Sequence, residues 1–220
     1  MNKLLLTLST LLVTTLTAVS AQSQEIKGDA KAGETKIAMC IGCHGIPGYQ
    51  ASFPEVYKVP KISGQNAKYI VASLNAYKQG ERKHPSMRGI SQSLTDQDMA
   101  DLAAYYELHG KTQAVAEAKI PEASAKVAEL LKKGACVSCH GESFNKPVSD
   151  AYPKVAGQHA DYMFVALKSY KTEGNATWGR ANGIMGGISK QFSNAELKQI
   201  AGYVSTMPGD LKTVPQSRFR

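Results

Sequence analysis

The stretch Cys-Ile-Gly-Cys-His-Gly at residues 40–45 recurs as Cys-Val-Ser-Cys-His-Gly at residues 136–141. These two stretches hold all four cysteines of the 220-residue chain, and a histidine directly follows each pair. Cys-x-x-Cys-His is the attachment signature of c-type haem. On a helix, residues three and four apart share one face. Both sulfurs can therefore form thioethers with the haem vinyl groups while the histidine reaches the iron from the same side, and the sequence predicts two covalently bound haem c groups.

Three other uses of paired cysteines fit this pattern less well. A disulfide framework is common in small exported chains, but it has no use for a histidine after each pair. A thioredoxin-like Cys-x-x-Cys predicts a preceding strand and a single copy. A zinc site would draw its ligands from separated pairs. Haem attachment is therefore the interpretation that accounts for both histidines.

The repetition extends well beyond the two motifs, which indicates an internal duplication. A phrase that begins Pro-Lys-x-x-Gly-Gln starts at Pro60 and again at Pro153. A third phrase, Met-x-Gly-Ile-Ser, starts at Met87 and again at Met185. The three offsets are 96, 93 and 98 residues, so short insertions and deletions fall between the phrases.

Each copy reads as a small set of helices without sustained strand alternation. Apolar residues recur at helical spacing over 67–78 and 160–171. Expected N-caps are Asp29 and Ser124, and capping boxes open the last helix of each copy at Thr95 and Ser193. The fold class is therefore all-α, with domains at 22–110 and 123–220 joined by an Ala/Lys/Glu-rich linker at 111–122. Domains of about this size have thin apolar cores, and a bound haem would fill the centre of each.

The first 21 residues have the features of a secretory signal peptide. Lys3 supplies a positive charge, residues 4–16 an apolar run, and Val19-Ser20-Ala21 a small-residue cleavage site. An uncleaved membrane anchor is the alternative, which the Thr/Ser content and the small-residue end disfavour. No later segment is apolar for long enough to cross a bilayer. We therefore expect a soluble protein exported to a bacterial periplasm.

The sixth ligand of each iron decides whether the haem is closed for electron transfer or open for chemistry. Met87 and Met185 are the methionines that occupy equivalent places in the two copies. Met/His ligation by Met87 with His44, and by Met185 with His140, is therefore predicted, and it raises the reduction potential. His84 is the main competitor of Met87, because it lies in the same loop.

The remaining candidates for the sixth ligand lack a counterpart in the other copy. Met99 lies on the apolar stripe of a helix, where core packing is the ordinary role of methionine. The others, which are helical, unmatched or aligned with a residue of a different kind, are Met39, Met163, Met207, His109 and His159.

Two further pairs of residues are candidates for contacts around the haems. A backbone carbonyl at or near Pro60 and Pro153 could accept a hydrogen bond from the axial histidine and fix its orientation, although both prolines would serve equally well in a simple turn. Arg82 and Arg180 could pair with haem propionates, although a solvated surface position is the more ordinary interpretation of both. Trp178 has no counterpart in the first copy, and the sequence assigns it no role.

Taken together, the two Cys-x-x-Cys-His copies, the Pro-x-x-x-Gly-Gln phrases and the Met…(Thr/Ser)-x-x-(Asp/Glu)…Ala-x-Tyr phrases resemble the dihaem cytochrome c4 family over essentially the whole mature chain. The resemblance implies two small cytochrome c folds facing each other across a pseudo-twofold, with the haems close together. It also implies a periplasmic electron carrier, often membrane-associated, that feeds a terminal oxidase. Dihaem subunits of flavin-containing sulfide dehydrogenases and of other periplasmic dehydrogenases carry a similar repeat. The family's haem-binding residues fall on Cys40, Cys43, His44, Met87, Cys136, Cys139, His140 and Met185.

The charge of the chain is uneven. Residues 22–117 hold 11 basic and 10 acidic residues, a net +1, whereas residues 118–220 hold 14 and 8, a net +6. This excess could steer the second domain toward an acidic redox partner or an anionic membrane surface, or serve solubility alone. Nucleic acid is not an expected partner of an exported haem protein.

Three functions therefore stand in order. The first is an electron carrier without catalysis, whose partners are an upstream donor and a terminal oxidase or cytochrome complex. The second is the electron-transfer subunit of a periplasmic dehydrogenase. The third is a dihaem peroxidase-type enzyme, which would require one copy to lack the matched methionine.

Overall fold

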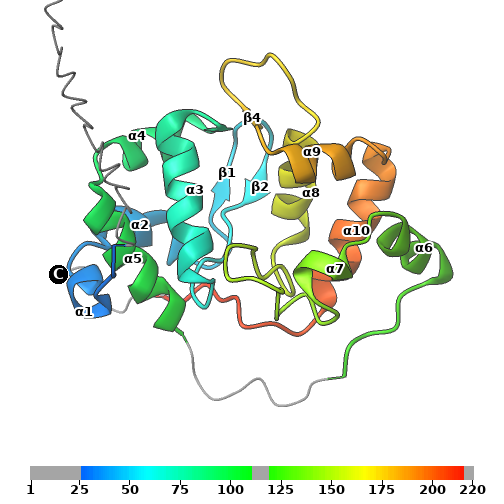
Figure 1. Ribbon diagram of the computed structural model, residues 1–220, viewed down its shortest axis with the longest axis horizontal. Coiled ribbons are helices and arrows are strands. Elements are labelled where there is room, and N and C mark those ends of the chain that lie inside the picture. The colour runs from blue at the N-terminus through cyan, green and yellow to red at the C-terminus, as the bar shows by residue number, and fades with distance from the viewer. Residues whose placement is uncertain (1–25, 111–118, 216–220) are drawn as a thin grey trace, which may run out of the picture.

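The computed structural model describes residues 26–110, here called the first half, and residues 119–215, the second half. Figure 1 shows the halves side by side, each a group of helices with few strands. The predicted signal peptide at 1–21 and most of the predicted linker at 111–122 lie outside the described residues. The expectation of an all-α fold is confirmed, with four two-residue strands added to it.

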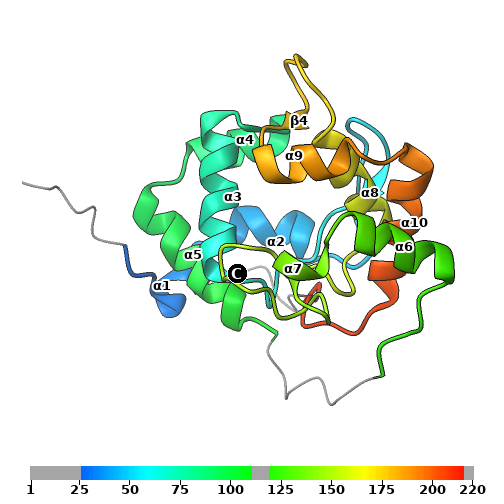
Figure 2. The ribbon, with the colours of Figure 1, turned by 45° about the vertical axis from the view of Figure 1, so that its right-hand side comes forward.

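The helices of the two halves follow the same order along the chain (Figure 2). Those of the first half are α1 (Ala30–Glu34), α2 (Ala38–His44), α3 (Ala67–Gln79), α4 (Pro85–Gln92) and α5 (Asp96–Leu108). Those of the second half are α6 (Ala125–Lys133), α7 (Val137–His140), α8 (Ala160–Ser169), α9 (Gly183–Ser189) and α10 (Asn194–Thr206). The strands are β1 (Gln50–Ala51), β2 (Tyr57–Lys58), β3 (Arg82–Lys83) and β4 (Gly179–Arg180).

The helix starts lie where the capping residues predict them. The side chains of Asp29 and Ser124 accept hydrogen bonds from backbone N–H groups in the first turns of α1 and α6. Complete capping boxes open α5 at Thr95 and α10 at Ser193. Each cap satisfies a backbone donor that the helix itself leaves free.

Each half has its own small apolar cluster around its last helix. In the first half Met99 and Leu102 of α5 are 0% and 2% exposed and pack with Ile37, Ile41 and Leu94. The core role predicted for Met99 is therefore confirmed. In the second half the cluster gathers around α10, and its members include Leu130, Phe144, Met163, Phe192, Leu197, Ile200, Val204 and Met207.

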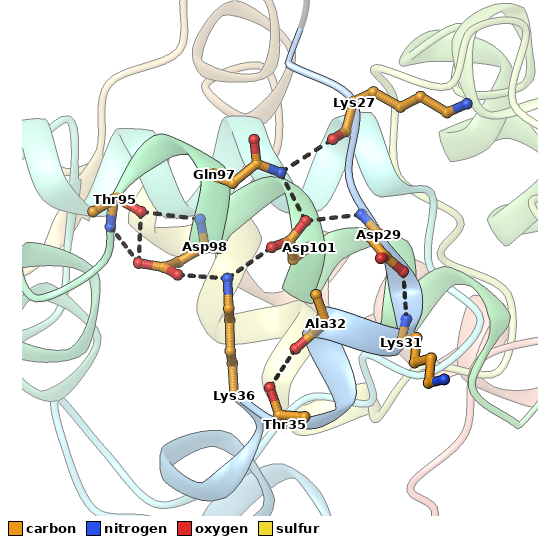
Figure 3. Close-up of polar contacts among 10 residues, drawn as sticks. All are labelled: Lys27, Asp29, Lys31, Ala32, Thr35, Lys36, Thr95, Gln97, Asp98 and Asp101. Atoms are coloured by element: carbon orange, nitrogen blue, oxygen red, sulfur yellow. Dashed lines mark hydrogen bonds and ion pairs between the residues drawn. The ribbon is translucent and has the colours of Figure 1, made fainter.

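A buried carboxylate fastens α1 to α5 in the first half (Figure 3). Asp101 is 3% exposed and accepts hydrogen bonds from the backbone N–H of Asp29 at 2.8 Å and from the amide of Gln97 at 2.8 Å. The ammonium of Lys36 lies 2.7 Å from Asp101 and 2.7 Å from Asp98. At the equivalent place in the second half, Gln199 is exposed, so this fastening belongs to the first half alone.

The two halves exchange a reciprocal set of hydrogen bonds. The side-chain oxygen of Gln65 accepts from the backbone N–H of Lys154 at 2.9 Å, and its amide donates to the Lys154 carbonyl at 2.9 Å. Gln158 does the same with the backbone of Lys61, at 3.0 and 2.9 Å. Because Gln158 is the repeat equivalent of Gln65, and Lys154 that of Lys61, these bonds have the reciprocity of a pseudo-twofold.

A short antiparallel ladder adds to this contact between the halves. Strand β3 of the first half pairs with β4 of the second, with Arg82 opposite Arg180 and Lys83 opposite Gly179. The ion pair between Lys58 and Asp161, at 3.2 Å, also crosses from one half to the other. Strands β1 and β2, in contrast, pair within the first half.

The chain end of the second half returns to the first half. Lys212 forms a β-bridge with Ser63, and its backbone N–H donates to the Ser63 carbonyl at 3.0 Å. Gly64 accommodates this crossing: its φ is +84°, and a Cβ there would lie 2.6 Å from the carbonyl oxygen of Asp210. A glycine is therefore required at this position.

Within residues 26–110 and 119–215, no helix is both long enough and apolar enough to span a lipid bilayer.

We expect Asp101→Asn to lower the free energy of unfolding by about 2 kcal/mol at pH 7, because it removes the charged acceptor of three hydrogen bonds. Lys36 and the Asp29 backbone hold the pKa of Asp101 below its usual range. The ionised carboxylate therefore stabilises the fold above the unfolded pKa, near 4. This contribution is lost as the pH falls through the lower folded value. Denaturant titrations at pH 7 and pH 3 measure both effects.

Gln199→Ala is the matched control for this substitution, since it changes the equivalent exposed position of the second half and should leave the stability unchanged. A difference between wild type and Asp101→Asn that does not shrink toward pH 3 would contradict the assignment.

A second prediction concerns the bonds between the halves. In Gln65→Ala the backbone N–H of Lys154 loses its acceptor, and in Gln158→Ala the N–H of Lys61 loses its own. We expect each substitution to speed hydrogen exchange of its own partner amide, by about tenfold or more. Amide exchange followed by NMR resolves the two positions, and each variant is the control for the other. Equal exchange rates in both variants and wild type would show that the reciprocal bonds do not protect these amides.

Candidate functional site

One continuous cavity of about 920 Å³ runs through both halves. Its volume lies at the upper end of the range for small-molecule sites. Apolar side chains from both halves supply much of the wall. The structure brings all eight residues predicted to bind haem to this cavity: Cys40, Cys43, His44, Met87, Cys136, Cys139, His140 and Met185.

Local helical structure brings the three side chains of each motif together. In the first half Cys40, Cys43 and His44 all lie on α2. In the second half Cys136 immediately precedes α7, the single turn that contains Cys139 and His140. All four cysteines are free thiols. The spacing of three and four residues places each set of side chains on one helical face.

Each motif histidine is held by a backbone carbonyl of its own half. The Nδ1–H of His44 donates to the Pro60 carbonyl at 2.8 Å, and that of His140 donates to the Pro153 carbonyl at 3.0 Å. The predicted role of these two prolines is therefore confirmed. Burial is the main cause that lowers the pKa of both histidines. Each ring is thus neutral with an unprotonated Nε2, the form in which histidine ligates a metal.

The two methionines lie in equivalent helix starts. His84 caps α4 and accepts from the Met87 backbone N–H at 3.4 Å. Asn182 caps α9 and accepts from the Met185 backbone N–H at 2.9 Å. The same local structure therefore presents a methionine to the cavity in both halves.

His84, the competitor of Met87, also lines the cavity. Its Nδ1 is occupied by the Met87 N–H, and its Nε2 is buried with no hydrogen-bond partner among the described residues. The ring meets Phe53 edge-on at 6.1 Å. Because Asn182 fills the same capping position in the second half, capping accounts for His84 without iron ligation.

Two other methionines reach the cavity without a counterpart. Met163 on α8 is 8% exposed and belongs to the core cluster of the second half, as predicted for it. Met39 on α2 is 51% exposed and lines the cavity from its edge. Trp178, to which the sequence assigned no role, also lines the cavity, with the Lys168 ammonium 5.8 Å from its ring.

The ordinary interpretation of Arg82 and Arg180 as solvated surface residues is wrong. Both line the cavity, in the ladder where the halves meet. The Arg82 guanidinium lies 4.6 Å from the Tyr77 ring, and its Nε is buried without a hydrogen-bond partner. Neither guanidinium forms an ion pair with a carboxylate in the described part of the chain. Sequence reasoning missed this because the burial depends on the other half.

One phenol is shared by the two arginines. The Tyr162 hydroxyl accepts hydrogen bonds from Arg82 at 2.6 Å and from Arg180 at 3.1 Å. Burial raises the pKa of Tyr162, but the two guanidiniums outweigh it and lower the pKa to about 8. The site is therefore strongly electropositive and suits an anionic group.

These features together fit the haem that the motifs predict. A buried charge requires a charged or hydrogen-bonding partner, and the unpartnered Arg82 Nε, in a wall with two guanidiniums, suits the carboxylates of haem propionates. The apolar wall suits the porphyrin, and a neutral histidine and a methionine in each half suit the iron. The residues of the cavity thus fit two c-type haems.

Several residues of the site escaped the sequence analysis. Tyr106 lines the cavity, and its hydroxyl is buried without a hydrogen-bond partner among the described residues. Gln65 and Gln158 line it where the halves meet. The two glutamines recur in the repeat, so a comparison of the copies could have marked them as candidates.

The family model described as Cytochrome c matches the chain twice, at residues 30–107 and 124–208. The chain is 34% identical over 221 residues to cytochrome c4 of Azotobacter vinelandii, across 93% of this chain and 98% of that protein. It is 28% identical over 203 residues to the thiosulfate dehydrogenase electron acceptor of Stutzerimonas stutzeri, across 89% and 91% of the two chains.

Among solved structures, the chain is similar to reduced recombinant cytochrome c4 from Pseudomonas stutzeri. The TM-score is 0.61 at 27% identity, and the match covers 82% of this chain and 100% of that one.

Proposed function

Since the chain belongs to the cytochrome c4 family, with two tandem cytochrome c domains, we propose that it carries electrons in the periplasm from an upstream donor to a terminal oxidase or similar acceptor. The family makes the chain an electron-transfer protein with two covalently bound haem c groups. The acceptor and the compartment are the parts that we propose.

We assign the ligands of the two haems as follows. Cys40 and Cys43 attach the first haem, and His44 and Met87 are its axial ligands. The second haem takes the equivalent set, Cys136, Cys139, His140 and Met185. The observation that carries this assignment is that both complete sets line one cavity.

The residues of the chain support electron transfer rather than catalysis. When bound, each haem supplies an iron that exchanges one electron reversibly. The Pro60 and Pro153 carbonyls orient the two histidines, and the helix starts at α4 and α9 fix the two methionines. With a protein ligand on each side, neither iron keeps a position for substrate. The shared cavity keeps the two haems near each other, which favours passage of an electron between them.

The proposed location rests on the sequence. Residues 1–21 are proposed as a cleaved secretory signal, and 22–110 and 123–220 as the two domains, joined by the linker 111–122. Covalent attachment at Cys-x-x-Cys-His also requires reduced thiols before attachment, and the four cysteines are not paired with one another in the structure.

The proposed partners are redox proteins, with association at an anionic membrane surface as a further expectation. The net +6 over residues 118–220 supports an acidic partner for the second half. Part of this charge is already matched: Lys154 pairs with Asp210 at 2.8 Å, and Lys168 and Lys190 pair with Glu55 and Glu173. Screening by salt should therefore weaken docking only moderately.

A second candidate function is electron acceptance from a periplasmic dehydrogenase, such as a flavin-containing sulfide dehydrogenase. The similarity to a protein named as a thiosulfate dehydrogenase electron acceptor favours it. Purification of the chain from its native cell discriminates the two functions. A stable complex with a dehydrogenase would favour this candidate, whereas a free protein that reduces an oxidase would favour the carrier.

Magnetic circular dichroism of the oxidised protein tests the ligand assignment. We expect two haems per chain, both low-spin, with the charge-transfer band of methionine bound to ferric iron. Met87→Ala and Met185→Ala should each remove half of this band, because each removes one of two equivalent ligands.

Met163→Leu is the matched control, since Met163 lines the same cavity but is not proposed as a ligand. It should leave the band intact. A bis-histidine signal from the first haem would assign His84 in place of Met87, and a high-spin signal from either haem would reverse the conclusion that both irons are closed.

A further inference from the structure

The two halves differ by one polar atom at the same place in their last helices. Tyr106 on α5 and Val204 on α10 are repeat equivalents, each is 3% exposed, and both line the cavity. Their backbones are held alike: the Gly64 N–H donates to the Tyr106 carbonyl at 2.8 Å, and the Gly157 N–H donates to the Val204 carbonyl at 3.1 Å. The difference therefore lies in the side chain, and chiefly in its hydroxyl.

The Tyr106 ring is fixed by its neighbours. It meets Tyr105 edge-on at 5.2 Å and His109 edge-on at 5.9 Å. The hydroxyl lies beside the Cys40 sulfur, close enough for Cys40 to contribute to the raised pKa of Tyr106, for which burial is the main cause. The raised pKa keeps the hydroxyl protonated, so it remains a hydrogen-bond donor at neutral pH.

A buried hydroxyl without a hydrogen-bond partner is unfavourable, and here it stands beside a sulfur that carries the first haem under the ligand assignment above. A hydroxyl can direct its proton, the positive end of its dipole, toward the thioether and the haem edge. Such a dipole favours the electron-rich, reduced state of the iron, since surrounding hydrogen bonds and polarity tune a haem's potential. Val204 offers no such dipole to the second haem.

We propose that Tyr106 is a positioning residue that raises the reduction potential of the first haem, so that an electron shared between the two haems moves toward the first. The proposal rests on the proposed haem ligation. It concerns the contribution of Tyr106 alone, to which the different charges of the two halves add their own.

Tyr106→Phe tests this, because it removes the hydroxyl and keeps the ring. Redox titration of the intact dihaem protein, with each haem resolved by NMR or magnetic circular dichroism, gives both potentials. We expect the electron-sharing equilibrium to shift about tenfold toward the second haem. For a one-electron couple this is a fall of about 59 mV in the first potential, with the second unchanged.

Tyr203→Phe is the matched control. It removes a hydroxyl from α10 that donates to the Pro121 carbonyl at 2.9 Å, and both potentials should stay unchanged. An unchanged or raised first potential in Tyr106→Phe, or an equal fall in both haems, would overturn the proposal. The failure of the ligand assignment is distinct, because it would show in the wild-type spectrum as a missing methionine band.

Discussion

Apolar side chains of both halves face a shared cavity, and most of the structure depends on how that cavity is filled. Protein interiors are normally close-packed, and unfilled apolar space is destabilising. Here a cavity of about 920 Å³ lies beside two small core clusters. Haem supplies the missing apolar surface, and its attachment to the chain makes that surface permanent. The same group relieves the two guanidiniums of the wall, which the described protein residues leave without a carboxylate.

Features that depend on local sequence could be predicted from the sequence. The haem motifs, the four helix caps and the burial of Met99 each follow from residues a few positions apart, and the structure confirms the caps and the burial. The anchoring of His44 and His140 spans 16 and 13 residues and was also predicted, because the repeat placed a proline after both motifs.

Features that join the two halves could not be predicted in this way. The interior position of Arg82 and Arg180 arises where β3 meets β4, across about a hundred residues of chain. The repeat marked Gln65 and Gln158 as equivalent, but equivalence does not tell that each bonds the backbone of the opposite half. The same limit applies to Tyr106, whose hydroxyl has meaning only in relation to the cavity.

The reciprocal bonds of Gln65 and Gln158 also say something about how such a chain can arise. In a symmetric homodimer, a residue contacts its partner on the other subunit, and the partner makes the same contact in return. The glutamine–lysine exchange has that form, and it makes no use of residues 111–122. Two separate copies of a single ancestral domain would present the same donors and acceptors to each other. Fusion of their genes would then have preserved a pairing already available to the dimer, and would have freed each copy to acquire polar groups of its own.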